Sequence, residues 1–535
     1  MDTETFLTKS YTQIRSVAAV PAGTQARTLP TSSALSLARS SLPSLSPSPS
    51  PSPSPSSSSS PSNLPPLAPL GPQATIQHLL TAVAPALPGH NRSGRYFGFV
   101  TGSSLPVAEA ADNLASALDT SVQVHLPEQS IATEVEDVAL RLLLRLLGLE
   151  SETSEEKGEG LGWEGRTFTT GATASNILGL ACGREEVVRR RLPAASEATV
   201  GELGILGACA EAGIREIRVL TSMGHSSLSK AASVVGLGRR AVKELPYSEA
   251  EPWRLDLDAV ERELKRTEEG IASIVAISAG EVNTGRFATT GLEDMRRLRE
   301  LADKYQAWIH VDGAFGIFAR ALPDTDEFAK LREATAGLEL ADSITVDGHK
   351  LLNVPYDTGI FFTRQSATLH AVFQNPNAAY LTPSGSGPAI PSPLNIGIEN
   401  SRRFRALPVY AVLLSEGAAG IAEMLARMVR LARGVALALI SDPDLKDDYE
   451  LLPADDAVES THVIVLFRAR DVGLNGVLVR KIQDSGEWYV SGTKWKGEPA
   501  CRIAVSSWRV NVEEDLEFVK SRLAGIAKEW KEGGR

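Results

Sequence analysis

The feature that most constrains this chain is the alternation of short β-rich segments with amphipathic helical segments from about residue 166 onward. The β-rich runs include "EIRVLTS", "SIVAISAG", "AWIHVDGA" and "SITVDG", and helical patterns such as "TASNILGLACGREEVVRRRL" and "GLEDMRRLRELADKY" separate them. Strands that alternate with helices pair mainly in parallel, because each parallel connection needs a crossover. The pattern therefore predicts a mainly parallel sheet covered by helices, with functional residues gathered where the strands end.

The rest of the chain is predicted to form three further segments. Residues 1–66 contain "SLPSLSPSPSPSPSPSSSSSPSNLPP" and are expected to be a disordered tail, because a Pro/Ser alternation neither buries apolar area nor propagates a helix. Residues 67–150 carry helical periodicity and are expected to form an N-terminal helical arm. The alternation predicts a large α/β domain over residues 151–407, and residues 408–535 are expected to form a smaller α+β domain.

Composition excludes several classes of protein. The 535 residues include 65 Asp and Glu against 54 Lys and Arg, a formal net charge of −11, which argues against nucleic-acid binding. The three cysteines are far apart and suggest neither a disulfide framework nor a cysteine-rich metal site. No apolar run approaches the length of a membrane span, and the N-terminus does not read as a secretory signal. We expect a cytoplasmic protein, with a mitochondrial presequence as the alternative.

Common short motifs do not identify a function. "GLGRRA" at Gly236 is similar to part of a dinucleotide-binding glycine motif, but it follows a helical pattern rather than a strand. The sequence contains no G-x-x-x-x-G-K-[ST] phosphate loop, no H-E-x-x-H and no G-x-S-x-G. Nucleotide hydrolysis, zinc proteolysis and the common serine-hydrolase design are therefore disfavoured.

Polar residues follow several predicted strands directly. Asp312 comes just past the strand of "AWIHVDGAFG", and His349 and Lys350 come just past the strand of "ADSITVDGHKLLN". "FTTGATASN" is a small-residue turn that opens a helix and can hold a phosphate on backbone N–H groups, and His225 lies between a strand and a helix. A lysine near an apolar core can become a nucleophilic amine, and a carboxylate facing a pyridinium nitrogen keeps that ring an electron sink. Together these residues predict a pyridoxal-phosphate site.

The chain resembles the group II pyridoxal-phosphate-dependent decarboxylases, the family of aromatic-L-amino-acid, tyrosine, glutamate and histidine decarboxylases. The similarity runs from about Arg95 to Trp530, and "HVDGAFG", "DGHKLLNVPYDTG" and "SRRFRAL" carry it in the family's order and spacing. The resemblance implies the fold-type-I, aspartate-aminotransferase-like α/β architecture, with a large cofactor domain and a smaller C-terminal domain. It also implies a homodimer with active sites at the subunit interface.

The resemblance assigns roles to the residues at the strand ends. Lys350 matches the lysine that binds the cofactor as a Schiff base, and Asp312 matches the partner of the pyridine nitrogen. His225 matches the histidine that stacks on the cofactor ring, and Ala314 matches the residue that packs beneath it.

Four further positions match the family's cofactor contacts. Ala172 and Thr173 match the phosphate-binding turn, and His349 matches the histidine that contacts phosphate or substrate. Thr101, in "FVTGSSLP", matches a residue near the active site in an N-terminal segment that wraps around the dimer partner.

The sequence departs from better-known members of the family in two places. Where they commonly carry a Thr-rich turn, this chain has "SAGEVNTG", with Glu281 and Asn283 near the expected cofactor face. Many relatives have a tyrosine in the mobile loop before "SRRFRAL" that protonates the substrate carbon after carbon dioxide leaves. Here the loop "LTPSGSGPAIPSPLNIGIEN" contains no Tyr, His or Cys. Tyr380, just upstream, is the best remaining catalytic donor, and His349 is the next.

The resemblance implies an enzyme, a carboxy-lyase that converts an L-amino acid to its amine and carbon dioxide. Phe97 and Phe99 lie in a segment that lines the pocket in relatives, which favours an aromatic substrate and leaves acidic and other amino acids open. One alternative is another pyridoxal reaction on the same fold, such as oxidative deamination to an aldehyde. The other is a non-catalytic protein that retains the fold, which the presence of Asp312, His225 and Lys350 disfavours.

Overall fold

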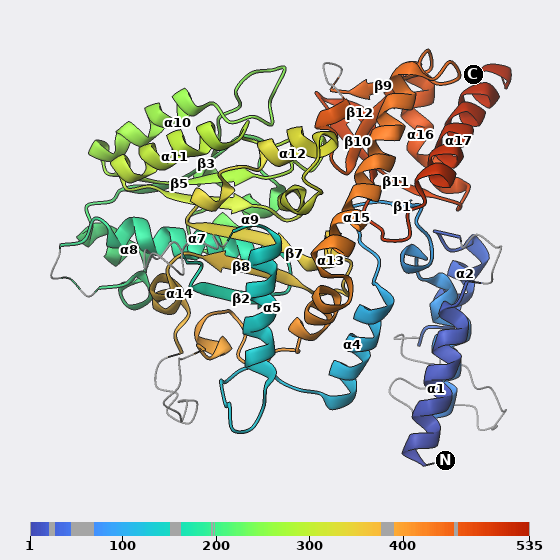
Figure 1. Cartoon of the computed structure of the whole chain (residues 1–535), viewed down its shortest axis with the longest axis horizontal. Coiled ribbons are helices and arrows are strands. Elements are labelled where there is room, and N and C mark those ends of the chain that lie inside the picture. The colour runs from blue at the N-terminus through green and yellow to red at the C-terminus, as the bar shows by residue number, and fades with distance from the viewer. Residues whose placement is uncertain are drawn as a thin grey trace, which may run out of the picture.

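A seven-stranded sheet forms the centre of the large domain in the computed structural model, which describes residues 2–20, 27–43, 69–149, 162–193, 196, 198–375, 390–453 and 458–533 (Figure 1). In spatial order its strands are β2 (Gly165–Thr169), β8 (Gly359–Thr363), β7 (Ser343–Asp347), β6 (Trp308–Asp312), β5 (Ile271–Ser278), β3 (Glu216–Thr221) and β4 (Val242–Glu244). The neighbours from β7 to β4 pair in parallel, and β8 is antiparallel to both β2 and β7. The predicted, mainly parallel sheet is confirmed.

Helices cover both faces of this sheet, because its strands are apolar on both sides. On β5, Ala272 and Ile274 pack in one hydrophobic cluster, whereas Val275 and Ile277 pack in another. One face carries α7 (Ala172–Arg189), α8 (Val200–Glu211) and α9 (Ser226–Val234); the other carries α10 (Leu257–Leu264) and α11 (Leu292–Tyr305) (Figure 1). Helix α12 (Ala329–Ala334), between β6 and β7, and helix α14 (Ser366–Phe373), after β8, complete the domain.

A five-stranded sheet organises the C-terminal domain. Its order is β1 (Tyr96–Phe97), β11 (Tyr489–Trp495), β12 (Glu498–Ala504), β10 (Ile464–Ala469) and β9 (Tyr449–Leu452), flanked by α16 (Val472–Asp484) and α17 (Val512–Glu532). Strand β1 pairs in parallel with β11, so a strand from the N-terminal arm belongs to the C-terminal sheet. This pairing carries the segment after Phe97 toward the large domain.

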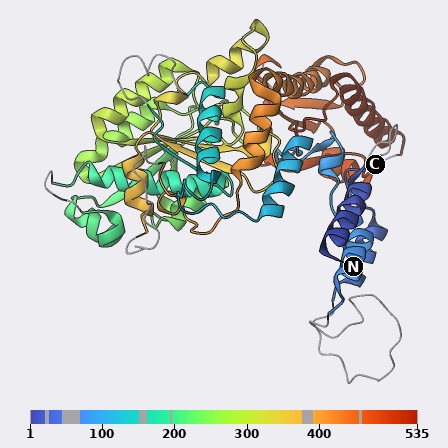
Figure 2. The same cartoon turned by 60° about the horizontal axis from the view of Figure 1, so that its bottom comes forward.

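The N-terminal residues correct one expectation. Within the predicted disordered tail, α1 (Thr3–Ala18) and α2 (Ser32–Ser41) are helical, each started by a side chain that accepts a backbone N–H at its N-cap. Contacts with the rest of the chain include an ion pair from Arg15 to Glu109. The Pro/Ser run from residue 44 onward lies outside the described residues. Figure 2 shows the blue N-terminal helices projecting from the body of the molecule beside the C-terminal domain.

The arm itself consists of α3 (Pro72–His78), α4 (Pro106–Leu118) and α5 (Ala132–Leu146), and the last two pack on the long helix α15 (Ala406–Ser441). Helix α15 is long and apolar enough to cross a membrane by length and composition, with a mean hydropathy of 1.4 over its best window. The expectation that no segment approaches such a length is therefore corrected. Much of α15 is buried between α4, α5 and α17, and buried core helices meet the same criterion.

A buried ion pair ties the start of α15 to the arm. Arg402 donates to the carboxylate of Glu136 on α5, and the two side chains are only 2% and 6% exposed. Burial raises the pKa of Glu136, and the adjacent guanidinium of Arg402 opposes that effect. The carboxylate therefore depends on Arg402 for its charge compensation.

Replacing Arg402 with Ala is expected to lower the free energy of unfolding by about 3–5 kcal/mol, because it strands a buried carboxylate. Urea unfolding followed by circular dichroism measures the change. Arg403→Ala is the matched control, since Arg403 is 39% exposed and pairs with Asp112 at the surface, where an ion pair contributes about 1 kcal/mol or less. Equal losses in the two variants would contradict the assignment.

Candidate active site

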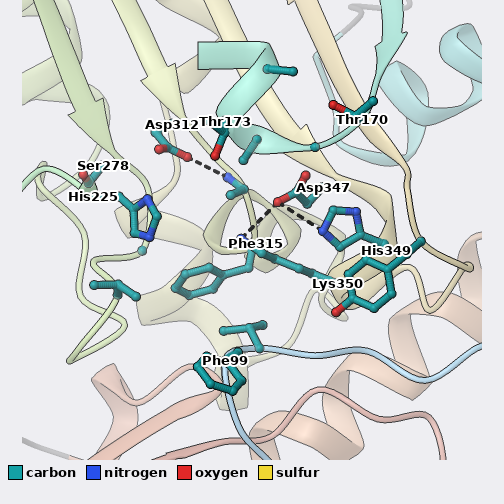
Figure 3. A pocket seen from close by; sticks show the side chains of 18 residues that line it. Phe99, Thr170, Thr173, His225, Ser278, Asp312, Phe315, Asp347, His349 and Lys350 are labelled. Carbon is teal, nitrogen blue, oxygen red and sulfur yellow. Dashed lines mark hydrogen bonds and ion pairs between the residues drawn. The ribbon is translucent and has the colours of Figure 1, made fainter. Parts of the chain in front are cut away.

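The carboxyl ends of five strands surround a cavity of about 340 Å³ (Figure 3). Ser278 ends β5, Asp312 ends β6 and Asp347 ends β7, and all three line the cavity. Gly171 and His225 enter it from the turns that follow β2 and β3. This edge is where a mainly parallel sheet binds its ligands, because the strand ends and helix N-termini converge there.

Asp312 is held in place by a buried amide on α7. Asn176 Nδ2 donates to Asp312 Oδ2 at 2.8 Å, and Asn176 Oδ1 accepts from Thr345 Oγ1 at 3.0 Å. Asn176 Oδ1 also lies 3.0 Å from Nε2 of His310, whose complete burial lowers its pKa to about 4. His310 is therefore a neutral structural residue, and the carboxylate of Asp312 is presented to the cavity in one orientation.

The same amide reaches His225 through a serine. Asn176 Nδ2 donates to Ser227 Oγ at 3.1 Å, and this hydroxyl lies 2.8 Å from His225 Nδ1, which also accepts the N–H of Ser227. Burial lowers the pKa of His225, more than Asp312 raises it. The ring is thus neutral near pH 7, and the hydrogen-bond network assigns its proton to Nε2.

Lys350 lies on the short helix α13 (Gly348–Leu351), and its ammonium group is paired with a buried carboxylate. Nζ is 3.0 Å from Oδ2 of Asp347, which is 2% exposed and also lies 3.6 Å from Nε2 of His349 (Figure 3). The ring of Phe315 lies below, with its centroid 5.7 Å from Nζ. Asp347 Oδ1 has no hydrogen-bond partner among the described residues, which leaves an acceptor beside the cavity.

The backbone of Thr358 fixes the ring of His349, and an aromatic ring packs on it. Its Nδ1 is 2.9 Å from the carbonyl oxygen of Thr358, and the ring of Tyr356 packs on it with centroids 4.6 Å apart. Burial lowers the pKa of His349, and the carboxylate of Asp347 opposes that effect. His349 and Tyr356 both line the cavity.

The N-terminus of α7 opens into the cavity without a cap. Gly171 occupies the N-cap position with φ 153° and no side-chain cap, and Ala172 and Thr173 begin the helix. The first N–H groups of a helix have no intrahelical partner and lie at the positive end of its dipole, so they bind anions. Gly359 packs directly behind Gly171. A Cβ added at residue 359 would lie 2.4 Å from the Cα of Gly171, so the turn has no room to shift toward β8.

Of the other three predicted site residues, the structure places Ala314 in the lining of the cavity and Thr101 outside it, and it does not describe Tyr380. Ala314 lines the cavity and is 8% exposed. Thr101 does not line it; its carbonyl accepts from Ser506. Tyr380 lies outside the described residues.

Glu281 and Asn283 lie near the cavity, beside Gly280 and Val282, but their side chains do not line it. Glu281 is 2% exposed and accepts the backbone N–H groups of Asn283 and Thr284, so its carboxylate closes its own turn. The side chain of Asn283 accepts from Thr493 of the C-terminal sheet. The cavity wall here is formed by Gly280 and Val282 instead.

Sequence reasoning missed several residues that build the site. Asp347 could have been found, since it ends a predicted strand three residues before Lys350. Asn176, Phe315 and Tyr356 carry no comparable signal, because none of them directly ends a predicted strand and their roles depend on contacts between distant segments.

The residues present fit the predicted cofactor. Lys350 offers a primary amine inside the cavity, Asp312 a carboxylate and His225 a flat neutral ring, and the uncapped N-terminus of α7 suits a phosphate. No cluster of His, Cys, Asp and Glu among the described residues could hold a metal ion.

Comparison with known proteins identifies the family. The family described as "Pyridoxal-dependent decarboxylase conserved domain" matches residues 79–470. The chain is 27% identical over 389 residues to L-2,4-diaminobutyrate decarboxylase of Acinetobacter baumannii, covering 70% of each protein. It is 25% identical over 474 residues to aromatic-L-amino-acid decarboxylase of Sus scrofa, covering 87% of this chain and 89% of that protein. The structure of Oryza sativa TDC with PLP and tryptamine has the same fold, with a TM-score of 0.74, 21% identity and coverage of 99% of this chain and 98% of that one. The chain therefore belongs to the pyridoxal-phosphate-dependent decarboxylases.

Proposed function

We propose that this enzyme decarboxylates an aromatic L-amino acid to its amine. The observation that carries the proposal is the wall of the cavity, where Phe99, Val282, Phe315 and Tyr356 supply apolar and aromatic surface. No arginine lines the cavity in the part of the chain that the structure describes, and Lys350 is paired with Asp347. An acidic substrate side chain would therefore lack a cation.

A basic side chain, as in a diaminobutyrate substrate, is supported less well than an aromatic one. Of the carboxylates that line the cavity in the described part of the chain, Asp312 accepts from Asn176 and Asp347 pairs with Lys350 through Oδ2, so only Asp347 Oδ1 is left for a basic group. Flat apolar rings, by contrast, pack well against aromatic walls. The relative from Sus scrofa, aromatic-L-amino-acid decarboxylase, is consistent with this choice.

The residues of the cavity divide the work of the reaction. Bound pyridoxal phosphate supplies a ring that withdraws electrons from the substrate's α carbon when carbon dioxide departs. Asp312 would hold a proton on the ring nitrogen, and the neutral His225 would contact the ring. Lys350 would supply the amine that binds the cofactor, and the N-terminus of α7 would hold the phosphate.

We propose that the enzyme acts as a homodimer in the cytoplasm. Phe99 lines the cavity yet is 63% exposed, so the wall of one chain is open at this point. Leu114 and Leu118 on α4 are 50% and 66% exposed, which provides apolar surface for a second copy. The three cysteines are unpaired, as expected in a reducing compartment.

A second candidate reaction is oxidative deamination of the same substrate to an aldehyde. It is favoured by the loop of residues 381–400, whose sequence contains no Tyr, His or Cys to protonate the α carbon. Incubation with aromatic amino acids under air, with measurement of amine, aldehyde, ammonia and peroxide, separates the two reactions. We expect amine as the main product; stoichiometric peroxide and ammonia would identify the second.

Borohydride reduction of the holoenzyme is expected to fix the cofactor on the peptide that contains "DGHKLLN", because Lys350 is the amine inside the cavity. Peptide mass spectrometry locates the label, and Lys350→Ala should lose both the label and turnover. Recovery of the label on another lysine, such as Lys230, would overturn the assignment.

Asp312→Ala is expected to reduce kcat by about 100-fold or more, because loss of the carboxylate removes an electrostatic partner worth a few kcal/mol of barrier. Cofactor occupancy, measured by absorbance, should change far less. Asn176→Ala, which frees Asp312 and His225 without removing either, should give a smaller loss. Near-normal turnover in Asp312→Ala would show that the ring nitrogen lies elsewhere.

Phe99→Ala is expected to raise KM for aromatic substrates by about tenfold, since burial of an aromatic ring contributes about 1.5–3 kcal/mol. The cofactor's absorbance should not change. Tyr247→Ala, at an aromatic residue that is 51% exposed and does not line the cavity, is the control. A KM unaffected by Phe99→Ala would place the substrate side chain against another wall.

A further inference from the structure

Decarboxylation requires a proton at the α carbon after carbon dioxide leaves, and the sequence offers Tyr380 and His349 as its donors. Tyr380 lies outside the described residues. His349 lines the cavity, but Nδ1 is 2.9 Å from the carbonyl of Thr358 and Nε2 is 3.6 Å from Asp347. Burial lowers the pKa of His349, so its ring is neutral near pH 7. Its one proton lies on Nδ1 and is directed at the Thr358 carbonyl, so Nε2 has no proton to give to a ligand.

Tyr356 supplies a phenol to the lining of the cavity. It lies six residues after Lys350, lines the cavity, and covers the ring of His349 with centroids 4.6 Å apart. Among the described residues it is the phenol that lines this cavity; the other hydroxyls there belong to Thr170, Thr173 and Ser278. Those are aliphatic alcohols, which are much weaker acids than a phenol.

The surroundings of Tyr356 suit a proton donor. Partial burial against the cavity raises the pKa of Tyr356 above the ordinary value of 10.0, so the phenol is protonated at neutral pH. The neighbouring hydroxyl group of Thr101 opposes this effect and lowers the pKa of Tyr356 in part, which favours the phenolate after the proton has left. The residue is 54% exposed, so water reaches it from the mouth of the cavity.

We propose that Tyr356 is the acid that protonates the α carbon of the substrate in this enzyme. The phenol O–H bond breaks, a C–H bond forms at the carbon that has lost carbon dioxide, and the phenolate regains its proton from water. The proposal rests on the decarboxylation proposed above but not on an aromatic substrate, since the proton goes to the α carbon whatever the side chain.

The test uses the reverse step, because the group that gives the proton also removes it from the amine product. Holoenzyme is incubated in D₂O with phenethylamine, tyramine, tryptamine or 1,3-diaminopropane, and NMR follows exchange of the α hydrogen. Tyr356→Phe should slow exchange by about 100-fold or more, the contribution of a positioned general acid or base. In the forward direction it should raise the ratio of aldehyde to amine under air.

Spectroscopy separates this role from a structural one. The near-visible cofactor band of Tyr356→Phe, its cofactor affinity and the spectral titration with an α-methyl aromatic amino acid should match those of the unmodified enzyme. Tyr96→Phe is the matched control, because it removes a partly buried phenol from the same N-terminal segment as Phe99 without removing a residue that lines the cavity. This variant should exchange at the normal rate.

Each outcome decides one question. Normal exchange by Tyr356→Phe overturns the proposal, and slow exchange by Tyr380→Phe in its place would identify Tyr380 as the donor. Altered cofactor affinity or a lost band in Tyr356→Phe would also overturn it, since the residue would then be structural. Exchange of 1,3-diaminopropane alone would overturn the aromatic substrate, while the effect of Tyr356→Phe on that amine would still test the donor.

Discussion

One buried carboxamide holds the cavity together. Asn353, in the left-handed conformation (φ 55°) just after α13, is 0% exposed. It donates to the carbonyls of Lys350, Leu351 and Ser506 and accepts from the N–H groups of Ser103 and Trp508. These bonds join the lysine helix, the N-terminal arm and the C-terminal domain at one point. An apolar side chain there would remove the acceptor of the Ser103 and Trp508 N–H groups, and each buried group left unpaired costs about 1–3 kcal/mol.

The wall of the cavity next to Phe99 depends on this junction. Phe99 and Val100 both have positive φ, 58° and 62°, which bulky residues rarely adopt. Such a turn persists only where its surroundings hold it. Thr101 N–H closes the turn onto the carbonyl of Gly98 at 3.0 Å, and Gly102 lies so close to α13 that a Cβ would come within 2.1 Å of the carbonyl oxygen of Lys350. The aromatic wall is thus positioned by the backbone of the lysine that it faces.

Charge in the cavity is arranged by a second amide. Asn176 orients Asp312 directly and His225 through Ser227, while burial keeps the imidazole neutral. Asp347 compensates the charge of Lys350. The carboxylate of Asp312, the neutral ring of His225 and the uncapped N-terminus of α7 therefore face the same cavity. Asn176 and Ser227, which orient the first two, do not line it. Such outer contacts keep polar groups in one orientation in a site that excludes water.

By itself, the sequence determined the mainly parallel sheet and the convergence of Asp312, His225, Lys350 and the turn at Ala172. The periodicity of apolar residues and the alternation of strands with helices can be read from short stretches of sequence. Parallel strands then bring their carboxyl ends to one edge of the sheet. Only the tertiary structure decided that Glu281 turns away, that Tyr356 enters the cavity, and that Asn353 and Asn176 join distant segments. These outcomes depend on contacts between residues up to hundreds of positions apart, such as Ser103 with Asn353 and Ser507. A local sequence pattern does not predict such contacts, because they form only when the packing of helices and strands brings these distant segments together.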